Sequence, residues 1–249
     1  MTVRSLALLF VVSLGLARAE GAKEAQALFE AMEAKLSSAK TLKVDFTSRM
    51  GPAGQQLEFK GQLCVAEGNK VKFGVEGAGP DGMPLSLSMT SNGTTTRTTS
   101  EESGRSSSQD NETDPNLTKL LRGAVSHFSV VGPVFLRAAE PGSEAFSSEN
   151  FSLGEKERDG ERSLQVIEFD TSAMGQGFHV KLWIDTVTGL PAKRVLDRGN
   201  QPAAITETFT GLELDAEFPE DTFKVTRQAD EGEGEGEGQA PTSRPVPAK

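Results

Sequence analysis

Several residue types are scarce in this chain of 249 residues, and each scarcity excludes a class of protein. A single cysteine excludes a disulfide framework and a cysteine-based zinc site. Two histidines leave little for a metal cluster. The 26 basic residues are outnumbered by 36 acidic ones, which argues against a nucleic-acid binder, because such proteins need a basic surface. Tyrosine is absent although phenylalanine occurs 14 times, so the aromatic surface lacks phenolic hydroxyls.

The N-terminal 19 residues have the pattern of a secretory signal peptide. Arg4 supplies a positive start, residues 5–16 form a short apolar run, and Ala17-Arg18-Ala19 fits a cleavage site. The run of 12 residues is shorter than the roughly 20 that a transmembrane helix needs. We therefore expect cleavage after residue 19 and a periplasmic location.

The C-terminal residues 230–249 read DEGEGEGEGQAPTSRPVPAK and have no apolar periodicity. Such a composition buries too little apolar surface to offset its ordering entropy, so we expect a disordered acidic tail. The folded domain is then expected to span residues 20–229.

Hydrophobic periodicity predicts an α+β domain. Residues 22–38 have the spacing of an amphipathic helix, and a second helix is expected from Asp114-Pro115 through residue 128. Residues 134–138 form a further short apolar element after Gly132-Pro133. The segment 101–114 is serine-rich and is expected to be mobile. Alternating patterns predict antiparallel strands at 42–47, 57–65, 70–75, 85–89, 94–99, 164–169, 180–184, 192–197 and 205–214.

Several of these motifs, in this order, resemble the periplasmic lipoprotein carrier LolA and its superfamily. They are TLKVDFTS at 41–48, Gly61-x-Leu63-x-Val65, the Ser91-Asn92-Gly93-Thr94 hairpin, and KLWIDTVTGLPAKRVLDRGNQPAAITETFTGLELDAEFPEDTFKV at 181–225. The resemblance implies a curved antiparallel β-sheet, an open half barrel, with α-helices covering the concave face. It also implies a non-catalytic carrier or binding protein, whose apolar cavity shelters lipoprotein acyl chains or other lipids.

The resemblance implies a set of residues lining that cavity. They are Phe46, Leu63, Val65, Val71, Phe73, Val75, Leu87, Met89, Leu121, Val125, Phe128, Phe135, Leu182 and Ile184. One departure concerns the lid: family carriers have Arg-Pro after the Gly-x-Leu-x-Val strand, whereas this chain has Glu67-Gly68. The lid latch of the family therefore has no counterpart at these positions.

Two other interpretations remain open from the residues alone. The apolar strand faces would equally suit a filled core, and the same fold serves sensory or protein-interaction domains of the cell envelope. We expect a monomer without cofactor or bound metal, which binds lipid and has an envelope protein as a second kind of partner.

Enzymatic chemistry finds little support. His127 and His179 lack an accompanying GxSxG motif, so a secreted hydrolase is the least favoured hypothesis. Asp110, Glu112 and Asp114 form only a weak cation-binding pattern. Cys64 has no cationic neighbours in the sequence and is expected to be an inert thiol.

Overall fold

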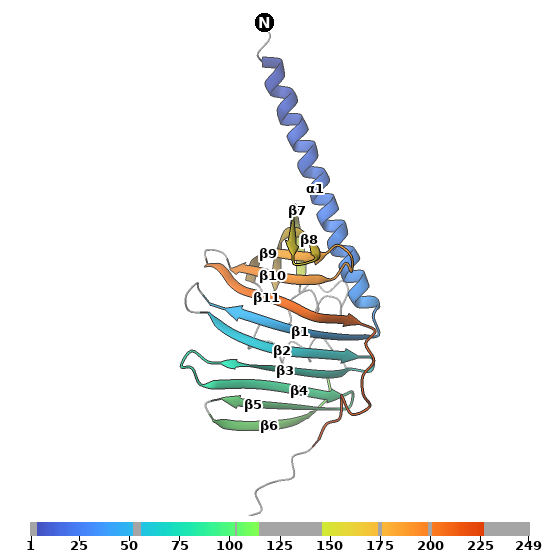
Figure 1. Cartoon of the computed structure of the whole chain (residues 1–249), viewed down its shortest axis with the longest axis vertical. Coiled ribbons are helices and arrows are strands. Elements are labelled where there is room, and N and C mark those ends of the chain that lie inside the picture. Colours follow the sequence, from blue (N-terminus) through green and yellow to red (C-terminus); the bar gives the residue numbers. More distant parts are fainter. Residues whose placement is uncertain are drawn as a thin grey trace, which may run out of the picture.

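Eleven antiparallel strands form one open sheet in the computed structural model, which describes residues 4–51, 56–102, 104–114, 146–173, 176–198 and 201–226 (Figure 1). The expected curved α+β sheet is thereby confirmed. The elements of the described residues are α1 (Arg4–Ser38), β1 (Thr41–Met50), β2 (Leu57–Ala66), β3 (Lys70–Ala78), β4 (Pro84–Asn92), β5 (Thr95–Glu102), β6 (Arg105–Glu112), β7 (Phe146–Asp159), β8 (Arg162–Ala173), β9 (Gln176–Asp185), β10 (Pro191–Arg198) and β11 (Gln201–Leu214).

The strand order is β6-β5-β4-β3-β2-β1-β11-β10-β9-β8-β7. Each half of the sheet is a run of neighbouring hairpins, and the first and last strands meet in the middle. There Phe46 of β1 pairs with Phe209 of β11. Strands β6 and β7 stand at the two open edges, so the sheet does not close into a barrel.

Helix α1 begins at Arg4, earlier than the expected start at residue 22, and runs without interruption to Ser38. Its N-terminal part projects beyond the sheet (Figure 1). The apolar run of the expected signal peptide contains five leucines, which favour helix, so the helix continues through it. Among the described residues, no helix combines the length and apolar content that a membrane crossing requires.

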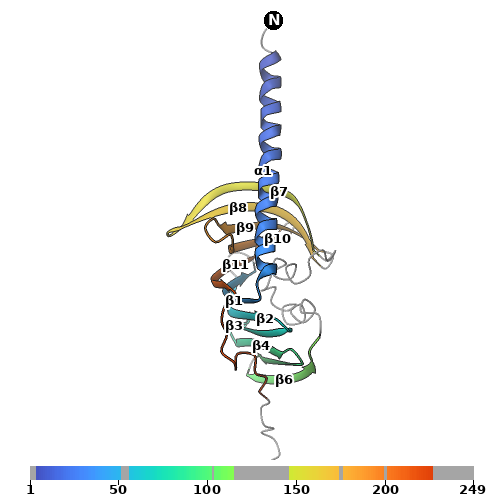
Figure 2. The same cartoon turned by 90° about the vertical axis from the view of Figure 1, so that its right-hand side faces the viewer.

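The second half of α1 packs on the apolar face of the sheet. Ala25, Phe29, Met32 and Leu36 are buried at helical spacing, as the sequence predicts. The Phe29 ring lies 4.7 Å from that of Phe169 on β8. Figure 2 shows β7 and β8 arching across this helix, so the curvature of the sheet and the helix enclose one core.

Two strands differ from the sequence expectations. Residues 105–112 form β6, a fully exposed edge strand, and the expectation of a mobile segment there was wrong. Ladder pairing with β5 and hydroxyl contacts such as Ser100 to Ser107 at 2.8 Å hold this strand without any apolar side chains. Strand β7 was not predicted, because two shifts in its pairing with β8 interrupt the alternation of apolar residues.

Candidate functional site

The apolar face of the sheet gathers every predicted lining residue that the structure describes. Phe46, Leu63, Val71, Phe73, Val75, Met89, Leu182 and Ile184 are buried in one hydrophobic cluster, and Val65 and Leu87 pack against it half-buried. Leu121, Val125, Phe128 and Phe135 lie outside the described residues. The described positions come from β1, β2, β3, β4 and β9, so the face extends across both halves of the sheet.

Glycines allow two phenylalanine rings to lie flat over neighbouring strands of this face. A Cβ at Gly61 would come within 2.2 Å of the Phe46 ring and 2.5 Å of the Gly74 carbonyl oxygen. A Cβ at Gly77 would come within 2.4 Å of the Phe59 ring. The Phe46 ring in turn stacks beside Phe73 with centroids 6.3 Å apart. These glycines therefore make the face continuous and aromatic, a surface that suits hydrocarbon.

A charged pair interrupts the apolar face near its centre. Arg194 on β10 pairs in register with Glu207 on β11, which pairs with Ser48 on β1. All three residues are at most 1% exposed, and Arg194 Nη2 donates a hydrogen bond to Glu207 Oε2. Burial raises the pKa of Glu207 to about 7, against the opposing effect of the Arg194 charge.

Among the described residues, three polar atoms of this group have no hydrogen-bond partner: Arg194 Nε, Glu207 Oε1 and Ser48 Oγ. Leaving such an atom buried and unpaired costs about 1 to 3 kcal/mol. Sequence reasoning did not single out these residues. The available signal was the position of Glu207 between Ile205 and Phe209, where alternation points all three to the same face.

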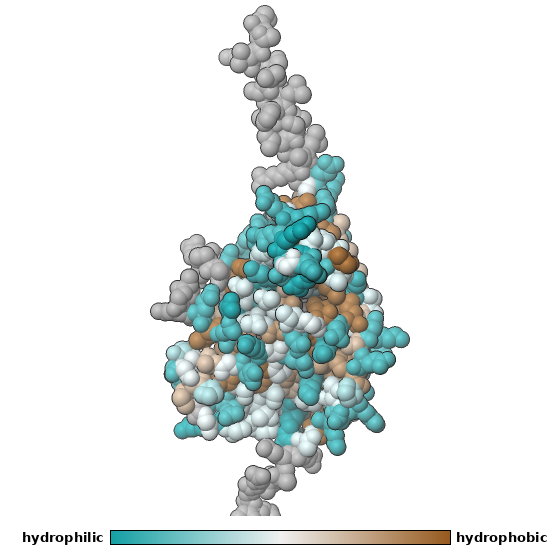
Figure 3. Space-filling model, in the orientation of Figure 1, coloured by the Kyte–Doolittle hydropathy of each residue, from teal (hydrophilic) through white to brown (hydrophobic). Residues whose placement is uncertain are grey.

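The opposite, outer face of the sheet carries mostly polar side chains (Figure 3). A small second cluster lies there, in which the Trp183 ring is approached by the ammonium groups of Lys181 and Lys193 at 4.8 and 4.5 Å. Trp183 Nε1 donates to Glu157 at 2.8 Å, which lowers the pKa of that carboxyl. Trp183 thus points away from Leu182 and Ile184, as the alternation predicts.

Cys64 lies on the outer face between two lysines that the sequence did not reveal as neighbours. Its register partners are Lys43 on β1 and Lys72 on β3. The thiol is nevertheless buried, and burial raises its pKa more than the two lysines lower it. A raised pKa keeps the thiol protonated, which is the condition for the inert role that the sequence predicts.

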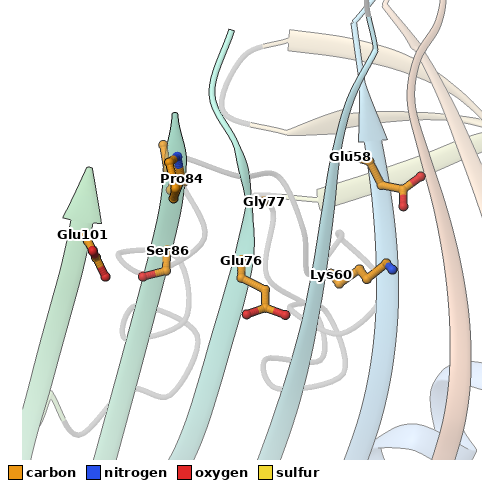
Figure 4. A pocket seen from close by; sticks show the side chains of 8 residues that line it. Glu58, Lys60, Glu76, Gly77, Pro84, Ser86 and Glu101 are labelled. Carbon is orange, nitrogen blue, oxygen red and sulfur yellow. The ribbon is translucent and has the colours of Figure 1, made fainter. Parts of the chain in front are cut away.

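A polar groove of about 490 Å³ crosses the outer face at β2, β3, β4 and β5 (Figure 4). Its lining residues are Glu58, Lys60, Glu76, Gly77, Pro84, Leu85, Ser86 and Glu101. Glu58 is engaged by Arg49 Nε at 2.8 Å, which lowers the pKa of the carboxyl. Within the described ranges, no group of three histidine, cysteine, aspartate or glutamate residues could hold a metal ion. With its charged lining, the groove does not suit hydrocarbon.

His179 lies half-exposed beside acidic partners. Its Nδ1 lies 2.8 Å from Asp170 Oδ1, and its Nε2 lies 3.8 Å from Glu168. The hydrogen bonds from His179 and from Asn150 lower the pKa of Asp170. This is an exposed ion-pair arrangement and not the nucleophile–base pair that the hydrolase hypothesis requires. His127 lies outside the described residues.

No protein-family model matches this sequence, and no curated protein matches it. Solved structures of similar shape include MucB, with 14% identity over 83% of this chain and a TM-score of 0.45. LprF from Mycobacterium bovis has 10% identity over 79% of this chain and 96% of its own, with a TM-score of 0.48. A domain from Vibrio parahaemolyticus, assigned as an outer membrane lipoprotein-sorting protein, has 9% identity over 81% of this chain and 97% of its own, with a TM-score of 0.38. The chain spans 64% of the length of MucB.

Proposed function

We propose that this chain is a non-catalytic cell-envelope protein that holds acyl chains of lipids or lipoproteins against the apolar face of its sheet. The observation that carries the proposal is the broad face of apolar side chains that spans both halves of an open, curved sheet. Burying an acyl chain on such a face gains roughly 0.8 kcal/mol per CH₂, so binding requires no catalytic group. The signal-peptide pattern of residues 1–19 supports delivery to the periplasm.

Neighbouring residues on β4 provide a matched test of this proposal. Leu87 is half-buried on the apolar face, whereas Ser88 is exposed and belongs to the outer face. A tryptophan at position 87 would fill space on the apolar face, so Leu87→Trp is expected to weaken binding of a fluorescent fatty-acyl probe at least tenfold. Ser88→Trp adds the same side chain to the other face and is expected to leave binding unchanged.

The protein for this experiment is produced with its own residues 1–19 in a bacterial host and purified from the periplasm. Native mass spectrometry of the purified protein is expected to show bound lipid and an N-terminus at residue 20. Circular dichroism checks that both variants are folded. Absence of lipid from the purified protein, together with no binding of the acyl probe after delipidation, would overturn the proposal.

A second candidate is an envelope protein-interaction domain of the same fold. The exposed edge strand β6 and the polar groove beside it favour this function, because an edge strand offers backbone groups for pairing with a partner strand. Thr99→Pro cannot distinguish the two functions, since β5 lies inside the sheet. In the β5–β6 register Ser106 is a position whose backbone N–H faces the free edge, so Ser106→Pro changes the edge without removing a hydrogen bond to β5. Loss of a co-purifying protein with retained lipid in Ser106→Pro would favour the interaction domain.

A further inference from the structure

The apolar face has a polar group built into one row of its side chains. Across the sheet this row runs Phe59, Ser48, Glu207, Arg194 and Leu182, so apolar residues flank the polar ones at both ends. The row from β1 to β10 beside it contains Met50, Ile205 and Leu196. These three polar side chains therefore lie between apolar neighbours on this part of the face.

Stability of the fold does not account for this group. A buried ion pair is commonly no better than two packed apolar side chains, and here three polar atoms lack partners as well. Buried polar atoms of native proteins are normally hydrogen-bonded, so three of them without a partner among the described residues suit a ligand that forms hydrogen bonds. All three side chains project from the sheet on the face to which acyl chains are proposed to bind.

The unpaired atoms define the chemistry of that partner. Arg194 Nε is a donor, Glu207 Oε1 is an acceptor and the Ser48 hydroxyl can act as either. A group that complements them must accept one hydrogen bond and donate another. A hydroxyl or a primary amide does both, whereas a carboxylate or phosphate would place its negative charge against Glu207.

We infer that Arg194, Glu207 and Ser48 bind the uncharged polar group of an acyl lipid, a hydroxyl or an amide, while the apolar face holds its chain. This inference rests on the proposed lipid-binding function and adds the class of lipid to it. The ligand class is therefore neutral: a monoacylglycerol or a fatty acyl amide in preference to a free fatty acid.

The test compares four C18 probes on the full-length exported protein after delipidation: 1-monooleoylglycerol, oleamide, oleate and the hydrocarbon octadecene. At pH 8 the wild-type protein is expected to bind the two neutral polar probes at least tenfold more tightly than oleate. The variant Arg194→Met/Glu207→Leu replaces the pair by apolar side chains. It is expected to bind octadecene unchanged and 1-monooleoylglycerol at least tenfold more weakly.

An outer-face pair serves as the matched control. Arg49→Met/Glu58→Leu removes an exposed ion pair of 2.8 Å, and all four affinities are expected to stay the same. Ser48→Ala removes a single buried hydroxyl and provides a second variant should the double substitution fail to fold. It is expected to weaken binding of 1-monooleoylglycerol about threefold and to leave octadecene binding unchanged.

The outcomes separate this inference from the proposed function. Equal binding of 1-monooleoylglycerol by the wild-type protein and by the folded variants would overturn the inference and leave the lipid-binding proposal intact. A preference of the wild-type protein for oleate would also overturn it. Failure of the wild-type protein to bind any of the four probes would overturn the proposed function itself.

Discussion

Glu207 gives the fold a pH dependence opposite to that of ordinary salt-bridged carboxylates. Burial raises its pKa to about 7, above the value of 4.5 expected in the unfolded chain. At a pH between 4.5 and about 7, Glu207 is protonated in the folded state and ionised in the unfolded chain. The stabilisation is therefore fully present below pH 4.5 and is lost as the pH rises through about 7.

This reasoning predicts that the free energy of unfolding falls between pH 5 and pH 7 by up to about 1.4 kcal/mol per pH unit. Urea denaturation at a series of pH values measures it. Glu207→Gln keeps the side-chain size and removes the titrating group, so its stability should change less over the same range. If the free energy of unfolding changes equally with pH in the wild-type protein and in Glu207→Gln, the raised pKa of Glu207 is contradicted.

Asp185 stabilises the hairpin between β9 and β10. Its Oδ1 accepts hydrogen bonds from the backbone N–H groups of Val187 and Thr188, at 2.8 and 2.9 Å, and these lower the pKa of the carboxyl. Asp185→Ala is expected to cost about 1 to 2 kcal/mol of unfolding free energy, measured by urea denaturation. Asp221→Ala, at an exposed position, should stay within about 0.5 kcal/mol of the wild-type protein. Equal losses in the two variants would contradict the capping role.

Single residues were predicted well where they are apolar and poorly where they are charged. Alternation placed Phe73 and Leu182 on the inner face because apolar side chains follow the pleat of a strand. The same rule applies to Arg194 and Glu207, but a charged side chain is normally assumed to face water. Their pairing depends on the β10–β11 register, which a sequence pattern alone does not fix.

At the scale of the strands, β2 depends on the absence of a side chain at Gly61. Gly61→Ala would bring its Cβ into the Phe46 ring and the Gly74 carbonyl, and we expect a loss of about 2 to 3 kcal/mol in unfolding free energy. Gly74→Ala on the adjacent strand is the matched control, because nothing lies within 4 Å of its added Cβ. Thermal or urea unfolding compares the two. If Gly61→Ala is as stable as Gly74→Ala, β2 and the Phe46 ring can shift to accommodate the added methyl group, which would contradict this prediction.

Phe29 packs helix α1 against β7 and β8. Its ring contacts those of Phe151 and Phe169, with centroid distances of 5.4 and 4.7 Å. Phe29→Ala is expected to cost about 3 to 5 kcal/mol in urea denaturation. Glu30→Ala on the exposed side of the same helix turn should cost less than about 0.5 kcal/mol. A small effect of Phe29→Ala would mean that Ala25, Met32 and Leu36 suffice to hold the helix on the sheet.

Elements were predictable where one face is buried and the pairing is regular. Strands β2, β3 and β4 have that pattern, and the sequence located each of them. Strand β6 has no apolar residue and so no period to detect, whereas the irregular pairing of β7 disrupts its period. Both are edge strands, where burial on one face gives the weakest pattern.

At the scale of the whole molecule, residues 215–226 run along the ends of the strands from β1 to β5. Thr41 Oγ1 donates to the Ala216 carbonyl at 2.7 Å, and Arg97 Nη1 donates to the Thr226 carbonyl. Between these points the Phe223 ring packs edge-on against that of Phe218 and is buried. The segment therefore ties the N-terminal half of the sheet together.

A chain ending at residue 226 is accordingly expected to match the full-length protein in unfolding free energy, because the sequence of residues 230–249 offers nothing to bury. A chain ending at residue 214 should lose about 3 kcal/mol through the exposure of Phe223 and the lost hydrogen bonds. Urea denaturation of the three chain lengths measures both effects. Equal stability of the chains ending at 214 and 226 would contradict the role of the segment.

The pairing of β1 with β11 in the middle of the sheet affects the order in which the parts of the sheet fold. Thr210 Oγ1 donates to the Asp45 carbonyl across 165 positions of the chain, whereas the other strand pairs join consecutive elements. A chain that crosses a membrane from its N-terminus presents β1 to β6 first and β11 almost last. Each half of the sheet can begin to fold from local hairpins, but the pairing of β1 with β11 can form only after β11 has emerged. Until β11 arrives, one edge of β1 is exposed, and this is the interval in which the protein is most vulnerable to wrong strand pairing.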